Sequence, residues 1–253
     1  SDELTQMGIE LLGSSSYLAD VEMVTTAIES LAACSGDDTS FSLELGDAGV
    51  FKELMGELNA TPEERENIRY LIETKNYPAL NDVLDTMGDG KIVASLKKLP
   101  ALFGGEEVFE KASQLYSSER IDEILKDLRK LYEDISAVIG KGRLTVDLGM
   151  VNNADYYTGV IIKGYLEGYG EEVLSGGRYN KLLSDFGYDI PATGFAINVD
   201  AVANVHLKSH TVCVQPADAV VFAASGYEIK AVTVAKELRD KGQIVEYALF
   251  DTM

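Results

Sequence analysis

Several residue types are scarce in this chain, and each scarcity argues against a class of protein. The 253 residues include only two cysteines, Cys34 and Cys213, which lie far apart and form no CxxC pair. A disulfide framework and a cysteine zinc site are therefore disfavoured, and a reducing, cytoplasmic location is expected. No apolar run approaches the ~20 residues that a membrane-spanning helix needs. No basic region followed by an apolar stretch opens the chain, so no signal peptide is expected.

Basic residues are also scarce: 22 lysines and arginines stand against 42 aspartates and glutamates, which gives a net charge of −20. Surfaces that bind nucleic acids neutralise phosphates with clustered lysines and arginines. This chain clusters neither residue, so its composition argues against binding of DNA or RNA. Hydrophobic residues make up 46% of the 253 positions, which is enough for a sizeable folded core.

The first half of the chain predicts a strand, a helix and a second strand, followed by a long helical block. Residues 3–13 alternate apolar and polar side chains as a strand does, whereas residues 17–33 repeat apolar side chains at helical spacing. Residues 41–45 alternate again. Residues 48–139 have an almost wholly helical pattern, with a capped helix start, Thr-Pro-Glu-Glu, at 61–64. Because this block holds no histidine or cysteine, we interpret it as a helical insertion or lid.

The second half predicts further strands of the same sheet. Strand patterns occupy residues 144–148, 157–167 and 172–175, a short helix is expected over 178–186, and a strand and a helix follow within 194–205. Strands on both sides of a helical block predict an α+β fold, in which a helical insertion interrupts an antiparallel sheet.

The domain organisation follows from these patterns. Residues 1–205 are expected to form the α+β domain, and residues 206–217 are interpreted as a linker. Residues 218–253 have the pattern of a βαβ unit, which is too short for a self-sufficient domain. We therefore expect a partial α/β accessory domain and interpret the chain as a fragment of a longer protein.

Two short motifs have structural explanations. His206 and His210 are four residues apart, but no third ligand or nearby glutamate accompanies them, so both are expected to be exposed rather than to bind zinc. The Gly-Asp-Gly-Lys segment at 88–91 lacks the flanking residues of a phosphate-binding loop and is expected to end a helix. No dinucleotide fingerprint, nucleophile elbow or HExxH motif occurs. We therefore expect no cofactor and no metal.

Polar side chains lie on one face of the first predicted strand. Gln6, Gly8 and Glu10 are two residues apart, so their side chains point the same way. A glutamine and a glutamate with a glycine between them could receive a small polar ligand. An exposed sheet face is the commoner explanation of the same pattern.

The densest candidate region is residues 150–202. The segment Asp-Tyr-Tyr-Thr-Gly at 155–159 precedes a predicted strand, and Ser-Gly-Gly-Arg-Tyr at 175–179 is expected to open a helix. Paired glycines at a helix start let backbone N–H groups approach a ligand, and tyrosine hydroxyls can orient a polar planar molecule. Two interpretations stay open, a small-molecule pocket and an aromatic core.

Four segments together resemble the catalytic domain of histidyl-tRNA synthetases. Residues 152–159 (NNADYYTG) and 176–182 (GGRYNKL) resemble the two histidine-specific motifs of that family. Residues 6–10 (QMGIE) resemble the end of the second class-defining motif, and 191–197 (PATGFAI) resemble the start of the third. Because their order and spacing also agree, the resemblance implies a class II aminoacyl-tRNA synthetase-like fold over residues 2–205.

The resemblance also implies a role for individual residues. It assigns Glu10 and Tyr157 to the imidazole ring of a bound histidine, and Gln6 and Tyr179 to its amino-acid end. The residues expected to line the pocket around these four are Gly8, Asp155, Tyr156, Gly176, Gly177 and Arg178.

Two departures from the family pattern bear on activity. Asn152 stands where the first histidine motif carries an arginine that contacts the substrate. Ala201 stands where the third motif supplies an arginine for ATP, and Asn198 replaces a glycine. Cations that face developing phosphate charge accelerate such reactions. The losses therefore argue against aminoacylation, and no catalytic residue is predicted.

A synthetase fold that keeps its amino-acid pocket without these arginines resembles the regulatory subunits of ATP phosphoribosyltransferase. That resemblance implies a non-catalytic subunit that assembles with a short-form catalytic subunit, in the first step of histidine biosynthesis. It implies L-histidine as the effector of feedback inhibition, and a homodimer within a hetero-oligomer. A histidyl-tRNA synthetase with divergent motifs is the main alternative, and a stand-alone amino-acid-binding protein is a third.

Overall fold

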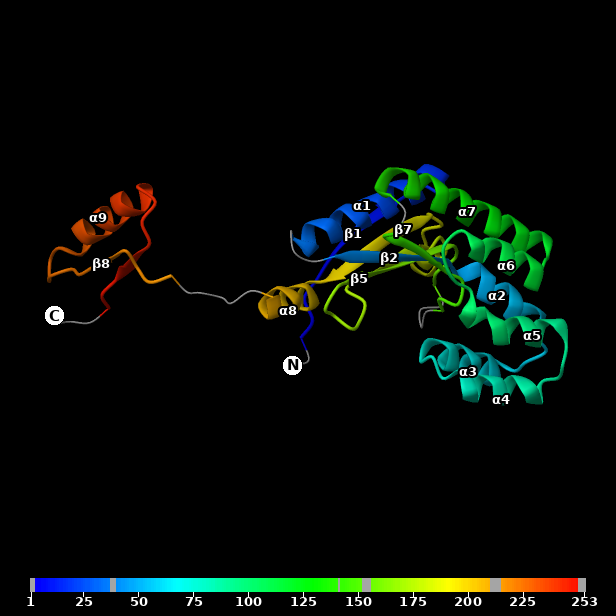
Figure 1. The fold of residues 1–253 in the computed structure, drawn as a ribbon. Coiled ribbons are helices and arrows are strands. Elements are labelled where there is room, and N and C mark those ends of the chain that lie inside the picture. Colours follow the sequence, from blue (N-terminus) through cyan, green and yellow to red (C-terminus); the bar gives the residue numbers. More distant parts are fainter. Residues whose placement is uncertain (1–2, 37–39, 141, 152–155, 210–214, 250–253) are drawn as a thin grey trace. The chain divides into compact units, whose positions relative to one another are not determined.

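The structure, a computed structural model, describes residues 3–36, 40–140, 142–151, 156–209 and 215–249. The chain divides after His206 into two compact units, residues 1–206 and 207–253 (Figure 1). Within the described ranges, no helix combines the length and the apolar character that crossing a membrane requires.

One sheet organises the larger unit. Its strands are β1 (Gln6–Leu12), β2 (Phe41–Asp47), β3 (Phe103–Gly104), β4 (Leu144–Asp147), β5 (Val160–Leu166), β6 (Leu174–Arg178) and β7 (Ala192–Asn198). They lie in the order β1-β7-β6-β5-β2-β4-β3. Neighbours are antiparallel except β2 and β4, which run parallel. The predicted α+β sheet is thus confirmed, with one parallel pair that the sequence pattern did not indicate.

Two long helices, α1 (Tyr17–Ser35) and α7 (Glu119–Ile139), cover one face of this sheet (Figure 1). Ser16 caps α1 by accepting a hydrogen bond from the backbone N–H of Ala19. Apolar side chains from the helices and from alternate strand positions fill the space between, including the fully buried Leu31, Leu43 and Leu45. Burial of this apolar surface is the main stabilising contribution to the unit. We call this side of the sheet the covered face.

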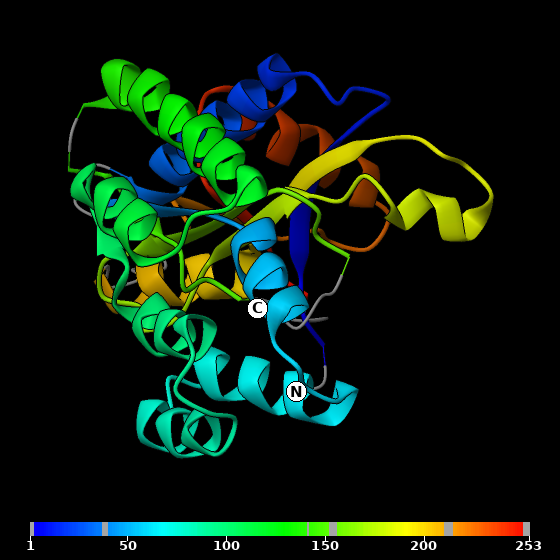
Figure 2. The same cartoon turned by 90° about the vertical axis from the view of Figure 1, so that its right-hand side faces the viewer.

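The predicted helical insertion is confirmed. Thr61 and Glu64 form the expected capping box, in which each side chain accepts a hydrogen bond from the other residue's backbone N–H. The helices α3 (Pro62–Glu73) and α4 (Tyr77–Thr86) lie on the side of the sheet away from α1 and α7 in both views (Figures 1 and 2). Before α7, the insertion consists of α2 (Ala48–Glu57), α3 (Pro62–Glu73), α4 (Tyr77–Thr86), α5 (Lys91–Lys98), the 3-10 turn η1 (Leu99–Ala101), β3 and α6 (Glu107–Leu115).

The helix predicted over residues 178–186 is wrong in its first part. Strand β6 continues to Arg178, and only a 3-10 helix, η2 (Leu182–Phe186), follows. The glycines explain the difference. A Cβ atom at Gly176 would collide with the backbone of β7 at Gly194 and Phe195. The glycine pair therefore allows close packing of neighbouring strands rather than opening a helix.

Helix α8 (Val199–Ser209) includes residues 206–209, the first part of the predicted linker. His206 is half-buried rather than exposed, and its Nε2 atom lies 2.8 Å from the carbonyl oxygen of Cys34. His210 and Cys213 lie outside the described residues. In the smaller unit, β8 (Ala219–Val221), α9 (Glu228–Asp240) and β9 (Val245–Tyr247) form the predicted βαβ arrangement with parallel strands.

Candidate functional site

The first candidate residues lie on the edge strand β1. Gln6, Gly8 and Glu10 are all exposed and share the face of the sheet opposite α1 and α7, which we call the site face. A Cβ atom at Gly8 would lie 2.7 Å from the carbonyl oxygen of Phe195. Glycine is therefore needed here for the close approach of β1 to β7, not to leave room for a ligand.

Glu10 lies over a floor made of glycine. Its carboxylate contacts Gly194, the residue opposite it on β7, and Gly194 in turn pairs with Gly177 of β6. Two adjacent residues without side chains leave a flat patch of backbone beside the carboxylate. Partial burial at this place raises the pKa of Glu10 above its ordinary value.

Three tyrosines stand at the other end of this floor. Tyr157 and Tyr179 are buried, with ring centroids 6.4 Å apart and ring planes inclined at 65°. Tyr156 completes the cluster at 4.5 Å from Tyr157 and 5.8 Å from Tyr179. The Tyr157 ring packs directly on Gly177, where a Cβ atom would lie 2.9 Å from the ring. The aromatic cluster and the glycine floor therefore depend on each other.

Glu10 and Tyr157 are also coupled electrostatically. Burial raises the pKa of Tyr157, and its hydrogen bond with Tyr156 and the negative charge of Glu10 raise that pKa further. Tyr157 is therefore a neutral phenol, which can donate or accept a hydrogen bond, and Glu10 is an acceptor when ionised. A carboxylate, a phenol and flat backbone can bind a planar ring that carries N–H groups.

The site does not bring all the predicted residues together. Gln6 pairs with Asn198 and lies four residues from Glu10 along β1, roughly 13 Å at the usual rise of a strand. Asn152 and Asp155 lie outside the described residues. The glutamate, Tyr156, Tyr157 and Tyr179 therefore form the coherent part of the candidate site.

Gly176 and Arg178, which were predicted to line the pocket, lie on the covered face instead. Side chains alternate along a strand, so these two residues point away from Gly177. Arg178 is only 6% exposed, and its Nε atom lies 2.8 Å from an Asp20 carboxylate oxygen on α1. Its Nη1 atom donates to the Ser14 carbonyl oxygen and to the Asn180 side chain, both at 3.0 Å. Arg178 holds the sheet to the helix layer rather than binding a ligand.

Two further residues hold the tyrosine segment, and the sequence analysis did not single them out. Lys52 of α2 donates a hydrogen bond to the carbonyl oxygen of Tyr157 at 2.7 Å. The Thr158 hydroxyl accepts one from the backbone N–H of Asn180 at 3.0 Å. Thr158 belongs to a segment that resembles a family motif, but nothing in the pattern around Lys52 indicates its contact with residue 157.

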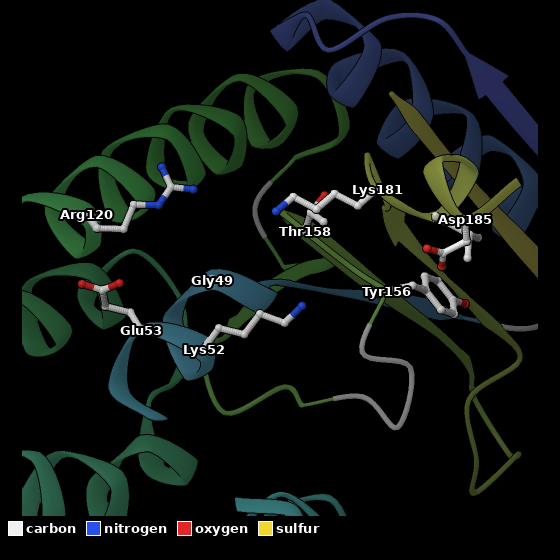
Figure 3. A pocket seen from close by; sticks show the side chains of 9 residues that line it. Gly49, Lys52, Glu53, Arg120, Tyr156, Thr158, Lys181 and Asp185 are labelled. Atoms are coloured by element: carbon white, nitrogen blue, oxygen red, sulfur yellow. The ribbon is translucent and has the colours of Figure 1, made fainter. Parts of the chain in front are cut away.

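Two cavities adjoin the tyrosines. Tyr157 lines one of about 320 Å³, together with residues of α2 and α3. Tyr156 lines another of about 770 Å³, which lies among α2, α7 and the segment leading into η2 (Figure 3). Among the residues with described positions, no three histidine, cysteine, aspartate or glutamate side chains are grouped to hold a metal ion.

The position that the resemblance aligns with the arginine of the third class motif has a structural role here. Ala201 of α8 is 1% exposed and belongs to the core of the larger unit. The Asn198 side chain accepts a hydrogen bond from the Ala201 backbone N–H at 3.0 Å, so it caps the start of α8. Both residues stabilise the junction of β7 and α8, and neither supplies a positive charge.

The histidyl-tRNA synthetase family model matches residues 1–202. The chain is 41% identical to an ATP phosphoribosyltransferase regulatory subunit of Clostridium kluyveri, over 99% of this chain and 65% of that protein. It is also 41% identical to the regulatory subunit of Clostridium acetobutylicum, over 99% of this chain and 62% of that protein. The chain therefore spans about two thirds or less of the length of these curated relatives.

A similar solved structure is that of an ATP phosphoribosyltransferase regulatory subunit/histidyl-tRNA synthetase from Bacillus halodurans. It superposes with a TM-score of 0.78 at 26% identity, over 96% of this chain and 62% of that one. The class II synthetase-like fold predicted from the four segments is thus confirmed.

Proposed function

The chain belongs to the histidyl-tRNA synthetase family, and we propose that it acts within that family as a non-catalytic regulatory subunit of ATP phosphoribosyltransferase. The observation that carries this proposal is the 41% identity, along 99% of the chain, to a protein of that description. The proposal assigns the reaction to a separate short-form catalytic subunit. This chain would activate that subunit and make it sensitive to histidine.

The structure of the β7–α8 junction supports the absence of synthetase activity. An adenylate-forming site needs positive charge where negative charge develops on the phosphates. The buried Ala201 cannot provide it, and Asn198 is engaged in capping α8. A buried alanine at this position packs in the core and carries no charge. Such a residue is expected in a subunit that does not bind ATP.

We place the effector, L-histidine, over the glycine floor between Glu10, Tyr157 and Tyr179. Glu10 would accept a hydrogen bond from an imidazole N–H, and the neutral Tyr157 would hold the ring's other edge. The resemblance places the amino-acid end at Tyr179, and Gln6, roughly 13 Å from Glu10 along β1, is not among the proposed contacts. Histidine would regulate the partner only through linkage, by binding one arrangement of the complex more tightly than another.

Reconstitution tests both parts of the proposal. The full-length protein is mixed with the short catalytic subunit, and product formation from ATP and phosphoribosyl pyrophosphate is followed with increasing histidine. We expect activation on mixing and inhibition by histidine. Glu10→Gln should raise the histidine concentration for half-inhibition at least ~10-fold, since it removes a charged acceptor worth ~1.5–3 kcal/mol. Glu22→Gln, at an exposed position on α1, is the matched control.

The outcomes separate the assignments. Activation with unchanged inhibition in Glu10→Gln would keep the regulatory role and reject the site. No effect on the catalytic subunit would reject the role itself. Histidine-dependent exchange of pyrophosphate into ATP by the protein alone would instead support the alternative, a histidyl-tRNA synthetase.

A further inference from the structure

Hydrogen bonds join the tyrosine segment, residues 156–159, to strand β6 on one side. The backbone N–H of Thr158 donates to the carbonyl oxygen of Arg178 at 2.7 Å. The Thr158 hydroxyl accepts from the backbone N–H of Asn180, as described above. These contacts fix the residue that follows Tyr157 against the sheet.

The helical insertion holds the same segment from the other side. The backbone N–H of Ala48 donates to the carbonyl oxygen of Gly159 at 2.9 Å, and the Lys52 ammonium group donates to that of Tyr157 at 2.7 Å. Both donors belong to α2 and lie four residues apart, which places them on one face of the helix, one turn from each other. Helix α2 is therefore the element through which the insertion contacts the candidate site.

Packing toward the insertion is less complete than packing toward the sheet. Ala48 belongs to the same apolar cluster as Tyr157, but the cavity of about 320 Å³ lies among Tyr157, α2 and α3. Lys52 lines this cavity and also the larger one beside Tyr156. Figure 3 shows its side chain extending from α2 toward the side of the larger cavity on which Tyr156 and Thr158 lie. A side chain that borders open space is not fixed by close packing alone, so the hydrogen bond from Lys52 matters for the position of Tyr157.

We infer that Lys52 is a positioning residue of the proposed histidine site, through which helix α2 of the insertion sets the affinity for histidine. The inference rests on the proposed function, because it concerns the same site. Lys52 donates to the backbone of Tyr157, so it occupies none of the hydrogen-bonding capacity of the phenol. A Tyr157 that is already ordered spares the ligand the cost of ordering it on binding.

Calorimetric titration of the full-length protein with L-histidine tests the inference. Lys52→Met removes the donor but keeps an unbranched side chain, and it should weaken histidine binding about 5-fold, the cost of ordering one side chain on binding. Lys52→Arg keeps a charged donor and should stay within about twofold of the unsubstituted protein. Lys111→Met, which removes the same charge from an exposed position on α6, is the matched control and should also stay within about twofold.

A double-variant cycle with Tyr157→Phe separates positioning from a general effect of the lysine charge. If Lys52 acts through the phenol of Tyr157, Lys52→Met should weaken histidine binding less in the Tyr157→Phe background than in the unsubstituted protein. An equal loss in both backgrounds would mean that Lys52 acts independently of Tyr157, and it would overturn the inference.

The failure of this inference differs from the failure of the proposed site. Unchanged affinity in Lys52→Met, alongside weakened binding in Glu10→Gln, would reject the role of Lys52 and keep the site. Absence of histidine binding by the unsubstituted protein would reject both. Urea unfolding of each variant shows that the affinities compare folded proteins.

Discussion

On the covered face of the seven-stranded sheet, the ionic side chains of Arg178 and Asp20 are enclosed together, whereas on the site face the carboxylates of Glu10 and Glu44 remain partly open. Arg178 and Asp20 are joined at 2.8 Å beneath α1. Glu44, by contrast, accepts a hydrogen bond from the Tyr165 hydroxyl at 3.0 Å, and burial raises its pKa as it does that of Glu10.

Charged side chains therefore have different roles on the two faces of the same sheet. On the covered face, each charge needs a partner, because a buried unpaired ion costs several kcal/mol. On the site face, the Glu10 carboxylate is exposed and therefore accessible to an N–H donor, while the partial burial that raises its pKa makes such a donor favourable. Substitutions on the covered face should therefore affect folding, and those on the site face should affect binding.

Arg178→Met should give the largest effect. It leaves the Asp20 carboxylate, which lies mostly out of water, without the guanidinium that pairs with it. Breaking a buried pair in this way costs about 3–5 kcal/mol of unfolding free energy. Urea unfolding measures it, with Arg129→Met as the control, since that arginine is 45% exposed. A loss below about 1 kcal/mol would show that Arg178 is not the structural residue that its position indicates.

The glycine floor offers the next test. A Cβ atom at Gly177 would collide with the Val160 carbonyl oxygen and lie 2.9 Å from the Tyr157 ring, whereas one at Gly170 would meet nothing within 4 Å. Gly177→Ala should therefore cost about 2–3 kcal/mol by overpacking. Gly170→Ala should stay within about 0.5 kcal/mol.

Histidine affinity sharpens this second test. If the Tyr157 ring forms part of the site, moving it off the floor should weaken histidine binding in Gly177→Ala, measured by calorimetry well below the variant's midpoint of thermal unfolding. Unchanged affinity at reduced stability would make the floor purely structural and remove Tyr157 from the proposed site.

The sequence predicted the elements well and the side-chain directions of β6 poorly. Apolar periodicity located α1, the helical insertion and the βαβ unit, because period and capping are local properties. The glycines at 176 and 177 predict a helix start from the sequence alone, since a glycine pair has the same appearance in a turn and in a tightly packed strand. Only the pairing of β6 with β7 decides between a turn and a strand. That pairing depends on tertiary contacts, which a local sequence pattern does not contain.

The same limit applies to the candidate site. A period of two placed Gln6 and Glu10 on one face, and the resemblance selected Tyr157 and Tyr179. Neither could show that Arg178 lies on the covered face and contacts Asp20 of α1. The contact of Lys52 with the carbonyl oxygen of residue 157 joins positions 105 residues apart, and no local pattern records it.

The pH dependence of stability in a variant of Asp47, on the covered face, gives the smallest expected effect. Burial raises its pKa from an ordinary 3.8 to about 6, although its carboxylate accepts the Gly49 N–H at the start of α2. Between these two pKa values the native state binds more protons than the unfolded state, so this group's contribution to stability falls as pH rises from about 4 to 7.

An asparagine can cap α2 in the same way but cannot ionise. Asp47→Asn should therefore gain about 1–2 kcal/mol relative to the unsubstituted protein between pH 4 and pH 7.5, measured by urea unfolding at each pH. Glu22→Gln, at an exposed position on α1, is the matched control. A flat or opposite trend for Asp47→Asn relative to this control would mean that the carboxylate at the end of β2 is better hydrated than its enclosure by the helices implies.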